Sequence, residues 1–549
     1  AFCLMKIGVL MIVAVMLWVT LYYVFKLLEN CHNDLFTQAG EKLFKQIKDN
    51  PKTPVWDVYP RPQLVRGSFL SLNGQWECKG HDIPVKFKDS DEYGNHDIPI
   101  PFNALWNLPS HNITVPFAPQ SIMSGYDGHM HMHYIYRKIF RLPEEFLRGA
   151  MPDDKVLLHF GAVDQVADVV LNGVELGHHE GGYLDFTLDC TDALKKNSEN
   201  ELKVIVKDML SHNYPYGKQS HERGGMWYTP VSGIWKSVWM ECVPNERIHG
   251  LKITPDLTGI TLKVDTDAAA IKVDVYEARI ENDRLGDDAR YAECVGRPII
   301  TVTHEADGQI VEHHTGGQVV THGSGNAIHA EDGAGDTTAC KHGDPVRIDI
   351  ADPHLWTPDE PYIYRIRITA GRDYVTSYFA LRTVTIEKKG ENNRVCLNGN
   401  PIYLNGVLDQ GYYSDGLYTP SSPEVYLDDI RKMKDMGFNL LRKHIKIEPE
   451  QFYYDCDMYG MLVMQDMVNN GFYRPFHDTY SANIWLFDQM RSSDRHGPST
   501  ETMKRIFREQ MEETVDKLYN HPSIICYTIF NEGWGQFDAD EMYEKMKEL

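Results

Sequence analysis

The hydrophobic and polar positions change their pattern twice along the chain, which divides it into three parts. In residues 59–245, apolar and polar side chains alternate in short runs separated by Gly, Pro and Asn. This alternation is typical of β-strands with one buried face. The pair Asn172-Gly173 lies between two such runs and predicts a tight hairpin turn. Many short strands with regular turn signals predict a β-sandwich.

A second β-rich part covers residues 246–390. Its strand candidates include residues 259–264, 271–276 and 362–369, and their spacing favours an immunoglobulin-like sandwich. Residues 304–344 interrupt the pattern with Gly, His, Asp and Thr and few apolar side chains, which predicts a long flexible loop. The histidines of this loop have no regular spacing, so we interpret them as solvated and predict no metal site.

From residue 391 to residue 549, strands and helices alternate. Pro449 and Gly460 are typical start and stop signals of a helix. Four strand–helix units predict a parallel sheet covered by helices, either a barrel or a doubly wound sheet. The absence of a Gly-rich phosphate loop argues against nucleotide binding. The four strand candidates are residues 401–404, 438–441, 462–464 and 523–530.

Polar side chains gather at the carboxyl ends of these four strand candidates. In a barrel of parallel strands, such residues point into one bowl. Glu532 has no evident packing role, so it is the first candidate for chemistry. Arg442 and His444 could instead be structural, and Asp466 could cap a loop. The candidates at the strand ends are Asp409, Gln410, Arg442, His444, Asp466, Asn469, Asn470, Asn531 and Glu532.

Aromatic side chains are interspersed with these polar candidates. A bowl that combines carboxylates, amides and aromatic rings suits a neutral polyhydroxylated ligand, because hydroxyls need donors and acceptors and sugar faces stack on rings. The aromatic residues are Tyr412, Tyr413, Phe472, Tyr473 and Trp534.

Length and charge limit the partners that we expect. The chain has 549 residues, enough for three or four domains of about 150 residues each. Its net charge of −23 argues against a nucleic-acid partner and against docking onto anionic lipid. The ten cysteines are scattered singly without a CxxC pair, so they indicate neither a zinc cage nor a disulfide framework.

The N-terminal segment has a different composition. Residues 7–25 carry no charge and lie between Lys6 and Lys26. This length can cross a hydrocarbon core of about 30 Å as a helix. We therefore predict a transmembrane signal anchor in residues 1–30 and a membrane-anchored or exported protein whose catalytic part is extracytoplasmic. An uncleaved or misjudged signal peptide is the alternative.

Asn531-Glu532-Gly533-Trp534-Gly535-Gln536, together with the preceding residues 519–523, resembles the acid/base signature of glycoside hydrolase family 2. This family includes β-galactosidases, β-glucuronidases and β-mannosidases. The resemblance runs from about residue 59 to residue 549. It implies a sugar-binding jelly-roll domain over residues 59–245, an immunoglobulin-like sandwich over 246–390, and a (β/α)8 TIM barrel from residue 391. Other segments that resemble the family are residues 225–235, 355–364, 379–384 and 437–444.

The resemblance implies a retaining exo-β-glycosidase that removes terminal β-linked sugars from oligo- or polysaccharides. Glu532 would be the general acid/base, with a pKa raised by burial beside a second carboxylate. Asn531 would hold the sugar 2-hydroxyl. The family needs no redox cofactor, and we predict neither a cofactor nor a metal. The further substrate-binding candidates are His444, Arg442, Asp409, Asp466 and Trp534.

The sequence departs from the family in its barrel. A retaining enzyme needs a second carboxylate about 5–5.5 Å from the acid. In this family it is a glutamate on the seventh strand, whereas this chain has four strand candidates. We therefore predict the N-terminal half of a barrel that is inactive alone, with a homo-oligomer or a complementing chain as partner. Asp409 and Asp466 are weak substitutes for the nucleophile. A catalytically dead, membrane-tethered carbohydrate-binding protein, one half of a split enzyme and a structural cell-surface protein are the alternatives, and the sugar stays open.

Overall fold

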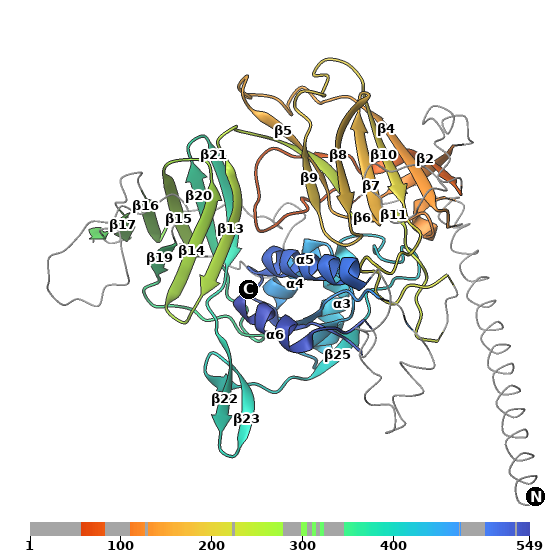
Figure 1. Ribbon diagram of the computed structural model, residues 1–549. Helices are drawn as coiled ribbons and strands as arrows, with labels where there is room; N and C mark the ends of the chain where they lie inside the picture. The colour runs from red at the N-terminus through yellow and green to blue at the C-terminus, as the bar shows by residue number, and fades with distance from the viewer. Residues whose placement is uncertain are drawn as a thin grey trace, which may run out of the picture.

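Figure 1 presents the computed structural model of the chain. The first β-rich part and the second β-rich part lie side by side, and the strand–helix part lies against both. The structure describes residues 56–82, 110–126, 130–221, 225–277, 298–304, 310–314, 319–322, 345–471, 473, 500–532 and 535–549.

Two antiparallel sheets enclose the core of the first part. The strands of the six-stranded sheet are, in order, β3 (His111–Val115), β2 (Gly74–His81), β4 (His133–Phe140), β10 (Asn200–Lys207), β7 (Val166–Leu171) and β8 (Val174–Glu180). The facing sheet contains β1 (Leu70–Ser71), β12 (Val238–Val243), β5 (Lys155–Phe160) and β9 (Phe186–Asp189). A short pair joins β11 (Gly233–Ile234) to β6 (Val163–Asp164).

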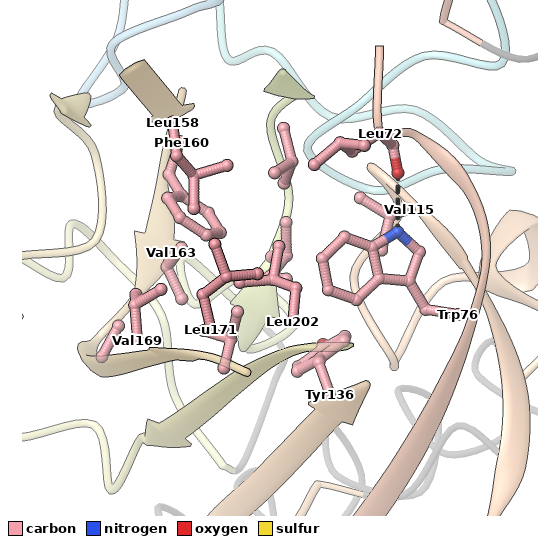
Figure 2. Close-up of a cluster of buried hydrophobic side chains, with 14 of the residues drawn as sticks. Leu72, Trp76, Val115, Tyr136, Leu158, Phe160, Val163, Val169, Leu171 and Leu202 are labelled. Carbon is pink, nitrogen blue, oxygen red and sulfur yellow. Dashed lines mark hydrogen bonds between the residues drawn. The ribbon is translucent and has the colours of Figure 1, made fainter. Parts of the chain in front are cut away.

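Alternating side chains from both sheets fill this core. Trp76 and Tyr136 come from one sheet, and Leu158 and Phe160 come from the other (Figure 2). The indole N–H of Trp76 donates to the carbonyl of Leu72 at 2.8 Å, which satisfies its only polar atom. The predicted sandwich of alternating strands is therefore present as two packed sheets.

The hairpin at Asn172-Gly173 is confirmed. Leu171 pairs with Val174 across the turn, and the two turn residues have φ of 53° and 86°. Two successive positive φ angles match the twist of the flanking strands, which is why Asn-Gly is favoured there.

The second part contains a three-stranded sheet and a six-stranded sheet, and both are antiparallel. Ile260 and Ile348 of the smaller sheet pack with Val273 and Ile366 of the larger sheet. The smaller sheet contains β13 (Ile248–Pro255), β14 (Gly259–Thr266) and β19 (Val346–Asp349). The larger contains β18 (Val319–His322), β17 (Ile310–His314), β16 (Ile300–His304), β15 (Ile271–Glu277), β20 (Tyr364–Ala370) and β21 (Asp373–Phe379).

The prediction of a loop over residues 304–344 is wrong in part. Residues 310–314 form β17 and residues 319–322 form β18, and these strands extend the larger sheet beyond β16. Each strand contributes a β-branched pair, which favours a pleated conformation over a solvated loop. Residues 305–309, 315–318 and 323–344 lie outside the described residues.

The first parallel strand begins later than predicted. Pro401 lies in a small antiparallel sheet of β22 (Val384–Lys389), β23 (Asn392–Leu397) and β24 (Asn400–Pro401). In Figure 1 the β22–β23 hairpin projects from the body of the molecule. The prediction of a barrel strand at residues 401–404 is therefore wrong, because this segment continues the hairpin. The parallel sheet begins with β25 (Gly406–Asp409).

The strand–helix alternation is confirmed. β25 is followed in one parallel sheet by β26 (Leu440–Lys443), β27 (Leu462–Asp466) and β28 (Ile524–Thr528). Pro449 and Gly460 bound the second helix as expected, and Gly460 has a φ of 71°. The helices are α3 (Glu424–Asp435), α4 (Glu450–Tyr459), α5 (Thr500–Leu518) and α6 (Ala539–Glu548).

One hydrophobic cluster joins the first part to the parallel sheet. Tyr183 and Trp235 of the first part pack with Leu441 and Val463 of the sheet and with Tyr426 of α3. Because this shared core is buried, the two parts hold a fixed relative position, and segments of the first part can contribute to the rim of the sheet.

The prediction of a membrane-anchored chain requires a correction. None of the helices that the structure describes combines the length and the apolar character needed to span a bilayer. The anchor that we predicted in residues 1–30 lies outside the described residues. We therefore do not retain the transmembrane assignment or the localisation that followed from it.

Candidate functional site

Asp466, Arg442 and His444 form a charged triad at the carboxyl ends of β26 and β27. The Nε of Arg442 donates to Asp466 Oδ1 and its Nη2 lies by Oδ2, both at 3.0 Å. The Nδ1 of His444 lies 2.9 Å from Asp466 Oδ2. Asp466 is fully buried, so the two basic side chains supply the partners that its carboxylate needs.

Asp409 lies on the opposite face of the same sheet. It pairs in register with Lys443, whose side chain alternates away from Arg442. The Nζ of Lys443 lies 2.7 Å from Asp409 Oδ2 and 2.8 Å from Glu448 Oε1. The structure thus separates Asp409 from the triad, although the sequence placed both in one bowl.

Electrostatics explains why this opposite-face cluster stays charged. Burial opposes the charge of Lys443, but Asp409 and Glu448 outweigh it and raise its pKa to about 12. Burial also disfavours the ionised form of Glu448, but Lys443 and Lys446 hold its pKa below the ordinary value. On this face of the sheet, acidic and basic side chains therefore stabilise one another in their charged forms.

Asn531 connects the triad to Glu532. The Nη2 of Arg442 donates to Asn531 Oδ1 at 2.8 Å. This bond fixes the orientation of the amide, so that its NH2 group points away from Arg442. The Nδ2 atom is buried and has no hydrogen-bond partner among the described residues. A buried amide donor without a partner is an expected feature of a site that binds a hydroxyl.

Glu532 lies at the rim and is accessible to solvent. Its side chain is 44% exposed, and its Oε1 lies 2.9 Å from the Nζ of Lys218. Lys218 belongs to the first part of the chain, so two parts meet at this carboxylate. Trp534 lies outside the described residues.

The segment that carries Lys218 is attached to the loop after β27. The backbone N–H groups of Tyr216 and Gly217 both donate to the carbonyl of Asn469 at 3.0 Å. The hydroxyl of Tyr216 donates to the carbonyl of Gly471 at 2.8 Å. The Nδ2 of Asn470 donates to the carbonyl of Asn213 at 2.9 Å. These bonds fix the backbone on both sides of the interface.

Aromatic rings from the two parts border the rim. Trp227 meets Tyr473 edge to face with ring centroids 5.0 Å apart, and Tyr228 meets Tyr412 at 4.7 Å. Burial and then the charge of Glu532 raise the pKa of Tyr228 to about 12. Half-buried rings of this kind provide stacking surface for a sugar.

Lys218 and Tyr228 are the site residues that the sequence analysis did not find. Tyr228 lies within a segment that resembled the family, so a signal existed for it. Lys218 is 314 residues from Glu532 and belongs to no motif. Among the described residues, no three His, Cys, Asp or Glu side chains are grouped as metal ligands would be.

Two family models match this chain. Residues 108–233 match the model described as "Glycosyl hydrolase 2 galactose-binding domain-like". Residues 389–549 match the model described as "Glycosyl hydrolases family 2, TIM barrel domain". The class is that of the glycoside hydrolases. Within it, the chain belongs to glycoside hydrolase family 2.

Curated relatives carry two enzyme names. A β-galactosidase of Thermoanaerobacter pseudethanolicus is 23% identical over 75% of this chain and 46% of its own length. A β-glucuronidase of Streptococcus agalactiae serotype V is 20% identical over 72% of this chain and 58% of its own length. The chain thus spans about half the length of these two relatives.

Solved structures share the fold. The β-glucuronidase from Ruminococcus gnavus in complex with D-glucuronic acid superimposes with a TM-score of 0.61 at 19% identity. The match covers 90% of this chain and 72% of that one. A β-D-glucuronidase of Dictyoglomus thermophilum gives a TM-score of 0.60 at 16% identity, over 89% of this chain and 71% of the other.

Proposed function

We propose that this chain takes part in the hydrolysis of β-linked glycosides as a retaining exo-β-glycosidase. The observation that carries the proposal is the buried Nδ2 of Asn531, which is oriented by Arg442 and has no partner among the described residues. It lies next to a rim carboxylate, as a donor to a sugar hydroxyl should. The relatives named β-galactosidase and β-glucuronidase support a terminal β-linked sugar as the substrate.

In the proposed mechanism, Glu532 protonates the glycosidic oxygen and later takes a proton from the attacking water. Asn531 donates its Nδ2 hydrogen to a sugar hydroxyl in the cleaved subsite. Arg442 and His444 hold that subsite in shape through Asp466. The solvent exposure of Glu532 is consistent with a group that meets both the leaving group and water.

Neither predicted substitute serves as the nucleophile in this proposal. Both oxygens of Asp466 are engaged by Arg442 and His444. Asp409 is engaged by Lys443 and by the backbone N–H of Gly411 at 2.9 Å, on the other face of the sheet. We therefore propose that the nucleophile is a carboxylate other than Asp409 and Asp466. We also propose that the first β-rich part is a jelly roll and that the second is an immunoglobulin-like sandwich.

A pair of substrates tests the acid role. We expect Glu532→Gln to lower kcat/KM by about 100-fold or more on an alkyl β-glycoside, whose leaving group needs a proton. On an aryl β-glycoside with an acidic phenol, the loss in the first step should be much smaller. Glu509→Gln is the control, because Glu509 is exposed and pairs with Arg505 on α5. Equal losses on both substrates, or no hydrolysis of either by the wild-type chain, would contradict the proposal.

A further inference from the structure

Lys218 reaches the rim of the parallel sheet from the first part of the chain. Its side chain is 8% exposed, whereas that of Glu532 is 44% exposed. The lysine is thus the fixed, buried member of the pair, and the carboxylate is the accessible member. We propose that Lys218 is a positioning residue that holds Glu532 at the rim and favours its ionised form. The catalytic consequence of this proposal rests on the proposed function, but the ion pair itself does not.

The backbone beneath Lys218 is rigid on both sides. Gly217 precedes it with a φ of 65° and lies so close to Ile445 that an added Cβ would come within 3.0 Å of its Cγ2. On the other side, the N–H of Tyr228 donates to the carbonyl of Lys218 at 2.8 Å. Gln219, the next residue, is buried and donates to the hydroxyl of Tyr183 at 3.1 Å. A lysine anchored in this way needs little ordering when it contacts Glu532.

Tyr228 and, on the other side of Asn531, Arg442 are further titratable groups in this region. Burial and then the charge of Glu532 raise the pKa of Tyr228 to about 12, so its phenol is neutral near pH 7. Arg442 lies beyond Asn531, and its charge is matched by Asp466, which also contacts His444. The Nζ of Lys218 lies 2.9 Å from Glu532 Oε1, so we expect its charge to lower the pKa of the carboxyl.

The ion pair between Lys218 and Glu532 opposes the raised pKa that the sequence analysis predicted for Glu532. A general acid works when its carboxyl is protonated, and an ammonium 2.9 Å away favours the carboxylate instead. In the proposed cycle, the proton passes from Glu532 to the leaving oxygen, and the carboxylate left behind is the form that Lys218 stabilises. The same form accepts a proton from water in the second step. Lys218 therefore supports the base half of the cycle.

Carbon-13 NMR of the side-chain carboxyl tests the proposal on the full chain without requiring turnover. We would follow the titration of Glu532, assigned with Glu532→Gln, in the wild type and in Lys218→Met. The pKa of Glu532 should rise by about one unit in Lys218→Met and return towards the wild-type value in Lys218→Arg. Lys155→Met is the control, because Lys155 pairs with Asp189 in the same part of the chain.

A second measurement needs no variant, in case Lys218→Met does not fold. Salt screens a half-exposed ion pair, so the pKa of Glu532 in the wild type should rise between 10 mM and 1 M NaCl. A pKa of Glu532 that changes neither with salt nor, where that variant folds, with Lys218→Met would overturn the proposal.

A pH–rate profile separates this inference from the proposed function. If both hold, the basic limb of kcat/KM moves to higher pH in Lys218→Met, because Glu532 stays protonated over a wider range. If the NMR shift is found without hydrolysis, the ion pair stands and the glycosidase proposal falls. If hydrolysis depends on Glu532 but neither its titration nor the basic limb changes, the positioning role of Lys218 falls and the glycosidase proposal stands.

Discussion

At the scale of residues, two strand-end aspartates in similar sequence positions have different surroundings. Asp466 faces Arg442 and His444 on the side of Asn531, whereas Asp409 faces Lys443 on the side of the helices. The sequence predicted that both belong to one bowl because each follows a strand. Successive side chains of a strand point to opposite faces of the sheet, so the face on which each aspartate lies depends on its position in the strand. For Asp409 this position depends on where β25 ends.

Asp466→Asn should disable the site. The substitution removes the negative charge that holds Arg442 and His444, so the orientation of Asn531 is lost with it. We expect kcat/KM per folded molecule to fall by about 100-fold, in the range of other groups that orient a substrate. Asp409→Asn is the matched control and should retain most of that activity, although both variants should unfold at lower temperature. A similar loss of activity in both variants would show that the two faces act as one site.

At the scale of elements, the sequence predicted those segments whose signals are local. The order β26, α4, β27, α5, β28 followed from apolar runs and helix stop signals, and the hairpin at Asn172-Gly173 followed from its turn chemistry. The first parallel strand was misplaced, because residues 400–401 pair back onto β23. Lys218 was missed because its position depends on packing between distant segments. Local patterns carry no information about such contacts.

Gly217→Ala should loosen the attachment of the Lys218 segment. Gly217 and Gly390 have φ of 65° and 67°, so both substitutions carry the cost of a left-handed alanine, about 1 kcal/mol. Only at Gly217 does an added Cβ approach a buried neighbour, Ile445. We expect Gly217→Ala to lower the free energy of unfolding by about 1–3 kcal/mol more than Gly390→Ala, because of the added overpacking. Urea unfolding measures this difference. Equal losses of stability in the two variants would mean that Ile445 moves away from the added Cβ at little cost.

At the scale of the whole molecule, a buried ion network fixes the first part to the second. Glu241 of β12 contacts Arg61 at 2.9 Å, Arg66 at 3.1 Å and His159 at 3.2 Å. Arg66 also reaches Asp373 of β21 at 2.8 Å. Burial alone would raise the pKa of Glu241, but Arg61, His159 and Arg66 outweigh it and hold the pKa well below the ordinary value. Arg66 therefore links the two β-rich parts through Asp373, and ionised Glu241 supplies a buried counter-charge to Arg66.

Glu241→Gln should destabilise the chain in a manner that depends on pH. At pH 7 we expect a loss of about 3–5 kcal/mol, because buried arginines lose their counter-charge. A depressed pKa contributes stability that is complete above the pKa of the unfolded glutamate and is lost as the pH falls below it. The difference in the free energy of unfolding between wild type and Glu241→Gln should therefore narrow between pH 5 and pH 3. Urea unfolding at each pH measures it. Glu77→Gln, at a half-exposed pair with Arg137, should cost less than about 1 kcal/mol.

The hydrogen bonds between residues 212–217 and residues 469–471 have a consequence for modularity. The strand–helix part does not form the whole rim around Glu532 by itself, since the first β-rich part supplies the ammonium of Lys218 and part of the aromatic border. A chimaera that contains the strand–helix part alone would contain Glu532 without its ion-pair partner Lys218. The two modules should therefore be exchanged together when chimaeras are built.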